Sequence, residues 1–124
     1  MKQLKESTED ILQAEIFKFY HNKYCNKLSN PQHLIFSVPN GGYRNKIEAM
    51  KMKATGLVAG VSDLIIVQPN RILFVELKKQ NGIQSKEQKE FQRKINILGF
   101  EYHIVRSKEE FIQIIELQNK LKEK

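Results

Sequence analysis

The segment "GVSDLIIVQPNRILFVELKK", residues 60–79, constrains the fold of this chain more than any other. Two apolar runs flank Pro69 and Asn70, which are typical of a tight turn, so we expect antiparallel strands over residues 63–68 and 71–78. Both faces of this pair are apolar, which predicts central strands that are covered on both sides. Three charged residues interrupt the apolar pattern: Asp63, Glu76 and Lys78.

The turn fixes which residues of the two strands face each other. Gln68 faces Arg71, so the residue numbers of every facing pair add up to 139. Asp63 and Glu76 form such a pair, and facing side chains on one side of a sheet have Cβ atoms about 4.5–5.5 Å apart. Lys78 lies two residues after Glu76 and points to the same face, because strand side chains alternate. The sequence therefore predicts that three charged groups converge.

Two facing carboxylates repel each other, and partial burial strengthens the repulsion. Lys78 offers one explanation, a structural salt bridge at the edge of the sheet. A divalent metal answers both negative charges, and hard oxygen ligands suit magnesium or manganese better than zinc. Glu15, on the predicted first helix, is either a further acidic residue of this site or an ordinary charged residue beside the buried helix face.

The charge distribution indicates a polyanionic partner. The chain has 124 residues and a formal charge of +7. Residues 44–94 hold 11 basic and 5 acidic side chains, a net charge of +6, and they include the strands with the acidic pair. Nucleic acid and a solvated basic surface are both compatible with this excess. An acidic metal site within a basic segment favours hydrolysis of phosphodiesters.

Length and composition favour one domain over residues 1–124, with an ordered core at about residues 8–121. Cys25 is the only cysteine, which excludes an intramolecular disulfide and a cysteine-cluster zinc site. No apolar run approaches the roughly 18 residues of a membrane span. We therefore expect a cytoplasmic protein without a membrane partner.

Hydrophobic periodicity and helix caps predict a mixed α/β fold in the order α-β-α-β-β-α-β-α, a β-sheet flanked by helices. Ser85 with Gln88 forms a capping box that opens the third helix, and Leu98 belongs to its expected inward face. Residues 55–60, "TGLVAG", return the chain to a strand. The other expected elements are helices over 8–24 and 45–55, strands over 33–38 and 100–105, and a last helix from Ser107.

The acidic pair and Lys78 resemble the signature of the PD-(D/E)XK nuclease superfamily. Four further segments are similar, in this order, to the VRR-NUC family: "VPNGGYR" (38–44), "KATGLVAGVSDL" (53–64), "FVELKK" (74–79) and "GIQSKEQKEFQRK" (82–94). The likeness extends from about Glu15 to the last helix. It implies a restriction-endonuclease-like fold.

The resemblance also implies roles for individual residues. Asp63 and Glu76 would be catalytic carboxylates that bind the metal, and the backbone carbonyl of Leu77 would be a further ligand. Lys78 would be the catalytic lysine. The resemblance further implies that Glu15 is the acidic residue of the first helix and that Gln88 assists near the metal or the phosphate. The capping box gives Gln88 a structural alternative, and Ser62 stands where the family usually has proline.

Basic residues around the hairpin are candidates for contact with DNA phosphates, although solvated helix faces have the same composition. They are Arg44, Lys46, Lys51, Lys53, Lys79 and Lys86.

The sequence thus favours a Mg²⁺- or Mn²⁺-dependent DNA endonuclease that selects for DNA structure, such as a four-way junction. The resemblance implies a homodimer of phage or bacterial type. One alternative is a non-catalytic DNA-binding module that retains the fold, although carboxylates that repel phosphate do not help a pure binder. Another is a structural protein in which the motif is an incidental salt bridge.

Overall fold

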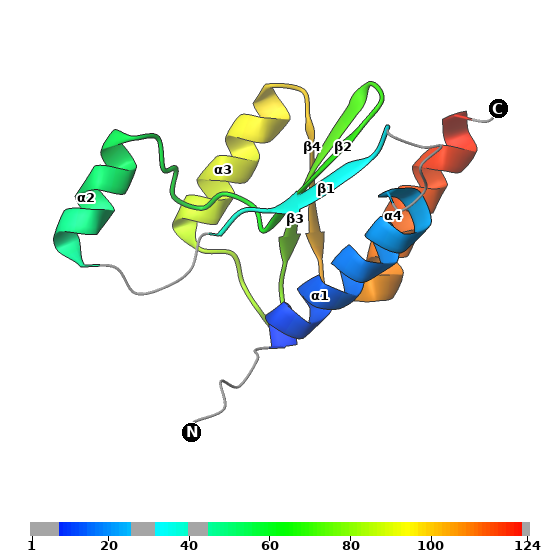
Figure 1. Cartoon of the computed structure of the whole chain (residues 1–124), viewed down its shortest axis with the longest axis horizontal. Coiled ribbons are helices and arrows are strands. Elements are labelled where there is room, and N and C mark those ends of the chain that lie inside the picture. Colours follow the sequence, from blue (N-terminus) through cyan, green and yellow to red (C-terminus); the bar gives the residue numbers. More distant parts are fainter. Residues whose placement is uncertain (1–7, 26–31, 40–44, 123–124) are drawn as a thin grey trace.

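The computed structural model describes residues 8–25, 32–39 and 45–122, with side chains described as far as Glu116. Helices lie on both faces of one four-stranded sheet (Figure 1). The order of helices and strands is the one predicted from the sequence, with a short π-helical turn, η1 (His21–Cys25), after the first helix. None of the helices in these ranges is long and apolar enough to cross a membrane.

The sheet has the strand order β1-β2-β3-β4. β1 (Leu34–Ser37), β2 (Leu64–Gln68) and β3 (Arg71–Leu77) are antiparallel neighbours, and β4 (Glu101–Val105) pairs with β3 in parallel. Asn70 in the β2–β3 turn has a positive φ of 60°, a conformation that asparagine tolerates better than most residues. The predicted hairpin is therefore confirmed.

One face of the sheet carries the main hydrophobic core. α1 (Thr8–Tyr20) and α4 (Lys108–Lys122) cover this face (Figure 1). The alternating burial of β2 and β3 turns every second side chain toward these two helices. The fully buried members of this core with large side chains are Ile16, Tyr20, Leu64, Ile66, Leu73, Phe111 and Ile115.

The opposite face of β3 and β4 is covered by α3 (Lys86–Ile97). The ring of Phe91 packs edge-on against Phe74 of β3 and Tyr102 of β4, with centroids 5.8 and 6.1 Å apart. The capping box of Ser85 is present, as predicted. The prediction for Leu98 was wrong: it is 69% exposed, because the helix ends before it and the chain turns at Gly99 with a φ of 89°.

α2 (Lys46–Ala54) begins at the cap of Asn45, whose side chain accepts a hydrogen bond from the backbone N–H of Glu48. It contacts no other helix or strand of the described chain and extends away from the sheet (Figure 1). Its apolar residues are consequently exposed, Ile47 by 68%. Residues 55–60 then form turns that lead into β2.

Candidate active site

The predicted acidic pair lies at the end of the hairpin that is remote from the turn. The observed register runs from Gln68 opposite Arg71 to Leu64 opposite Val75, so all facing numbers add up to 139, as predicted. Asp63 and Glu76 are the next facing positions, although Asp63 precedes β2 and does not belong to it.

Glu76 is fully buried, with 0% of its surface exposed. The hydroxyl of Tyr102 donates a hydrogen bond to its Oε1 at 2.5 Å, whereas its buried Oε2 has no hydrogen-bond partner in the described part of the chain. Burial raises the pKa of Glu76 above its usual value, because the ionised carboxylate loses its hydration, and the neighbouring side chains of Tyr102, Lys78 and Gln84 lower the pKa by smaller amounts. An ionised carboxylate in this position is costly unless a cation compensates it.

Asp63 is only partly exposed, and its Oδ2 accepts a hydrogen bond of 2.7 Å from the backbone N–H of Leu77. The side chain thus takes the place of a backbone acceptor just beyond the last pair of the ladder. Burial raises the pKa of Asp63, and the hydrogen bond from Leu77 lowers it by a smaller amount. Each acid of the pair therefore has one oxygen that is held by a protein donor.

Lys78 follows β3 and lies near both acids. Its positive charge lowers the pKa of Asp63 and of Glu76, which opposes the effect of burial. The backbone N–H of Lys78 donates to the carbonyl of Val105 at 3.0 Å, so the end of β4 fixes its main chain. Among the ion pairs of the described residues, none joins Lys78 to either acid, and the structural salt bridge is not formed.

Arg106 binds the loop that follows Lys78. Its Nη1 donates to the carbonyl oxygens of Lys79, Gln80 and Gly82 at 2.8, 3.3 and 2.9 Å. The guanidinium of Arg106, just after β4, thus holds three carbonyl groups of the loop between β3 and α3. The loop that carries the lysine is therefore constrained at both ends.

The first turn of α3 closes the other side of Asp63. A Cβ atom on Gly60 would lie 2.3 Å from the carbonyl oxygen of Glu87, and its φ is 81°, so only glycine fits this close approach. A cavity of about 480 Å³ lies here and is lined by both Asp63 and Gln88. The Gln88 Oε1 accepts from the backbone N–H of Ser85 in the capping box, so this contact does not use the amide N–H groups of Gln88.

The structure does not bring Glu15 to the acidic pair. Glu15 is exposed and lines another cavity together with Lys18, Lys23 and Lys108. Two other acids of α1 lie nearer to the pair. They are Glu9 and Asp10 in the first turn of the helix, and their negative charge raises the pKa of Asp63. In the sequence, Glu9 and Asp10 indicate only a helix start, because their position relative to the sheet depends on how α1 packs.

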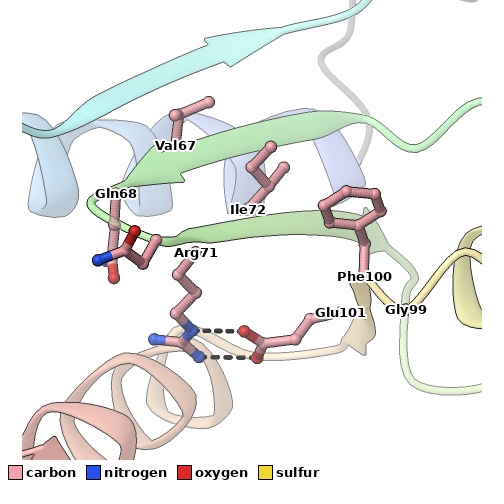
Figure 2. A pocket seen from close by; sticks show the side chains of 8 residues that line it. Val67, Gln68, Arg71, Ile72, Gly99, Phe100 and Glu101 are labelled. Atoms are coloured by element: carbon pink, nitrogen blue, oxygen red, sulfur yellow. Dashed lines mark hydrogen bonds and ion pairs between the residues drawn. The ribbon is translucent and has the colours of Figure 1, made fainter.

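A third cavity, of about 460 Å³, lies at the turn end of the hairpin (Figure 2). Its charged groups neutralise each other: Arg71 donates to Glu101 through Nε at 2.5 Å and through Nη2 at 2.9 Å. Glu101 also contacts His103 at 3.1 Å. No second carboxylate lines this cavity, so the acidic end of the hairpin is the candidate active site.

The sequence profile of the VRR-NUC domain matches residues 4–109 of this chain. The chain belongs to the VRR-NUC family. The match includes the whole hairpin, the loop held by Arg106 and α3. Family membership gives this VRR-NUC domain a nuclease-type function in DNA processing, with DNA as its substrate.

A solved structure described as a "VRR_NUC domain protein" is similar to this VRR-NUC domain with a TM-score of 0.68. The two sequences are 25% identical, and the similarity covers 92% of this chain and 89% of the other. This likeness agrees with a restriction-endonuclease-like fold. A comparison with curated proteins finds no match.

The donor atoms of this VRR-NUC domain suit a hard divalent cation. The described residues contain no group of three or more His, Cys, Asp or Glu side chains that could hold a metal ion by themselves. The structure instead offers two carboxylates, one of them with an unpaired buried oxygen. Magnesium is commonly bound through one or two carboxylates together with water and substrate phosphate, so this partial set fits it better than a cation that needs a complete protein cage.

The predicted DNA contacts of the VRR-NUC domain lie on two segments. Five of the six basic residues are exposed, three of them on α2 and two beside the candidate active site; they are Lys46, Lys51, Lys53, Lys79 and Lys86. Arg44 lies outside the described residues.

Ser62, at the position where proline is usual, is fully buried and donates a hydrogen bond to the carbonyl of Leu64 at 3.3 Å.

Proposed function

We propose that this protein is a divalent-metal-dependent endonuclease that hydrolyses phosphodiester bonds of DNA. One observation carries the proposal: the fully buried Glu76 has a carboxylate oxygen without a partner in the described chain, next to a second acid, Asp63. A structural carboxylate at this depth is normally paired. The unpaired oxygen is explained if the site binds a cation during function.

Asp63, Glu76 and the carbonyl of Leu77 are the groups that would hold Mg²⁺ or Mn²⁺. Such an ion would polarise a phosphate oxygen and lower the pKa of a water molecule. Glu9 is a further acidic residue near this region, since its negative charge raises the pKa of Asp63. We propose Glu9 in the place that the sequence assigned to Glu15.

Lys78 and Gln88 supply the polar groups that face the reacting phosphate. The ammonium of Lys78 would orient the attacking water and stabilise negative charge that develops on the phosphate. Gln88 would donate its amide N–H to a phosphate oxygen, while its Oε1 remains in the capping box. Both side chains belong to segments that the rest of the fold fixes, which suits a positioning role.

Branched DNA, such as a four-way junction, is the substrate that we propose. We also propose a homodimer, because two-fold symmetry would present two active sites to a symmetric junction. Lysines of α2 are exposed and would bind the DNA backbone.

The proposal is tested by incubating wild-type protein with four-way-junction, plasmid and single-stranded DNA in Mg²⁺, Mn²⁺ or EDTA. We expect cleavage of the junction in either metal and none in EDTA. Tight binding that is equal in EDTA and metal, without cleavage, would identify a DNA-binding module instead. Intact DNA in every reaction contradicts the proposed activity.

A further inference from the structure

The hydrogen bond between Tyr102 and Glu76 gives the two oxygens of one carboxylate different roles. Tyr102 pairs with Phe74 across the parallel β3–β4 ladder and lies on the same face as Glu76. Its hydroxyl reaches Oε1 at 2.5 Å, and Oε2 has no partner in the described chain. Oε2, which no donor holds, is therefore the oxygen better placed to bind a cation.

Packing fixes the hydroxyl of Tyr102 in this position. The side chain is 8% exposed, and its ring contacts Phe91 of α3 with a centroid distance of 6.1 Å. Phe91 also packs against Phe74, so the three rings form one cluster beneath the active site. Because these contacts involve the ring and not the hydroxyl, a phenylalanine at position 102 would preserve them.

We propose that Tyr102 is a positioning residue that restricts Glu76 to binding a metal through one oxygen and thereby selects Mg²⁺ over Ca²⁺. Magnesium requires near-octahedral geometry with single oxygens, whereas calcium accepts both oxygens of one carboxylate. A carboxylate with one oxygen hydrogen-bonded to a hydroxyl, as in Glu76, therefore suits Mg²⁺ better than Ca²⁺. The inference rests on the proposed metal-dependent function.

The structure contains a matched control for the removal of this hydroxyl. Tyr20 is fully buried, and its hydroxyl also takes part in hydrogen bonds, from Nε2 of Gln68 at 2.9 Å and with Nδ1 of His33 at 3.0 Å. It lies in the α1 core, whereas Tyr102 lies on the α3 face. Tyr20→Phe therefore repeats the same chemical change away from Glu76.

The test is a calorimetric titration of Mg²⁺, Mn²⁺ and Ca²⁺ into wild type, Tyr102→Phe and Tyr20→Phe without DNA. In Tyr102→Phe we expect Mg²⁺ to bind about tenfold more weakly, the scale typical of residues that orient a metal ligand. Binding of Ca²⁺ should be maintained or tightened, so that the Mg²⁺/Ca²⁺ affinity ratio falls. Tyr20→Phe should keep the wild-type ratio.

The outcomes separate this inference from the proposed function. If wild type binds all three ions but Tyr102→Phe keeps the same ratio, Tyr102 has no positioning role and the metal-dependent function stands. If wild type binds none of them, both fail. A crystal structure of wild type with Mn²⁺ gives a second test that needs no variant. It should show the ion on Oε2 with Tyr102 still on Oε1, and an ion bound to both oxygens would overturn the inference.

Discussion

Asp63 and Leu77 are joined by a hydrogen bond of 2.7 Å, from the backbone N–H of Leu77 to the carboxylate of Asp63, beyond the last pair of the β2–β3 ladder. Beyond the last backbone pair of the hairpin, the side chain of Asp63 thus accepts the hydrogen bond that a backbone carbonyl would otherwise accept. Together with the bond from Tyr102 to Glu76, it orients two acids with one oxygen each held by the protein. The site is arranged by the fold before any cation binds.

Glu76→Gln should stabilise the metal-free protein at pH 8. Glutamine can still accept the hydrogen bond from Tyr102 and carries no charge that needs hydration. A buried polar group that loses its compensation costs about 1–3 kcal/mol, so we expect a gain of that order in the free energy of unfolding. Urea denaturation in EDTA measures it, and cleavage should be lost in the same variant.

The stability that Glu76→Gln gains over wild type should increase with pH. The pKa of Glu76 is raised in the folded protein. Its favourable contribution to the free energy of unfolding is therefore present at low pH and is lost as the pH rises through the folded pKa. The advantage of Glu76→Gln over wild type should therefore grow from pH 4 to pH 8. Glu90→Gln, which changes an exposed acid, is the control. A constant or shrinking difference would contradict the assigned cause.

Glu101→Gln should show the opposite pH dependence. The hydrogen bonds from Arg71 lower the pKa of Glu101, so this pair stabilises the fold above the unfolded pKa and loses its effect as the pH falls through the folded pKa. We expect Glu101→Gln to cost about 1.5–3 kcal/mol at pH 7, as hydrogen bonds to charged groups do. The difference from wild type should shrink toward pH 2, and a denaturation series across pH measures it.

Lys78→Ala should abolish catalysis and preserve the fold. Removal of a positioned polar group typically lowers the rate about 10²–10⁴-fold, and Lys78 forms no ion pair with either acid. Single-turnover cleavage rates test this, with Lys18→Ala as control, because Lys18 is exposed and lines the separate cavity that contains Glu15. Equal rates in the two variants would remove Lys78 from the mechanism.

Arg106→Ala should loosen the loop after Lys78. Three carbonyl acceptors lose their shared donor, so hydrogen exchange in residues 79–82 should accelerate and stability should fall by about 1–3 kcal/mol. The comparison variant is Arg93→Ala, which removes an exposed pair with Glu90 and should change stability less than Arg106→Ala does. Unchanged exchange in the loop would show that Arg106 does not hold it.

Glu9→Gln and Glu15→Gln distinguish two positions on α1. Glu9 affects Asp63 electrostatically, whereas Glu15 lines a different cavity. We expect Glu9→Gln to weaken Mn²⁺ binding and cleavage about tenfold or more, and Glu15→Gln to leave both unchanged. The reverse pattern would restore the residue assigned from the sequence.

The hairpin could be predicted because its determinants are local. A two-residue turn at Pro69 and Asn70 fixes the register, and the register then pairs Asp63 with Glu76. Capping signals also act within a few residues, which is why the start of α3 at Ser85 was predicted. These features need no information about distant parts of the chain.

The remaining parts of the site depend on long-range packing. Tyr102 reaches Glu76 only because β4 pairs in parallel with β3, and Glu9 approaches Asp63 only because of the angle at which α1 packs. Periodicity marks an apolar helix face without showing whether a neighbour covers it. Hence Ile47 on α2 and Leu98 after α3 are exposed in spite of their pattern.

The central claim is that the pair of Asp63 and Glu76 binds a divalent cation. Equilibrium titration of Mn²⁺ into metal-free wild type and into the double variant Asp63→Asn/Glu76→Gln, followed by calorimetry, tests it most directly. We expect saturable binding to wild type and none to the double variant, with both proteins folded. Equal binding by the two proteins, or no binding by wild type, would contradict the account.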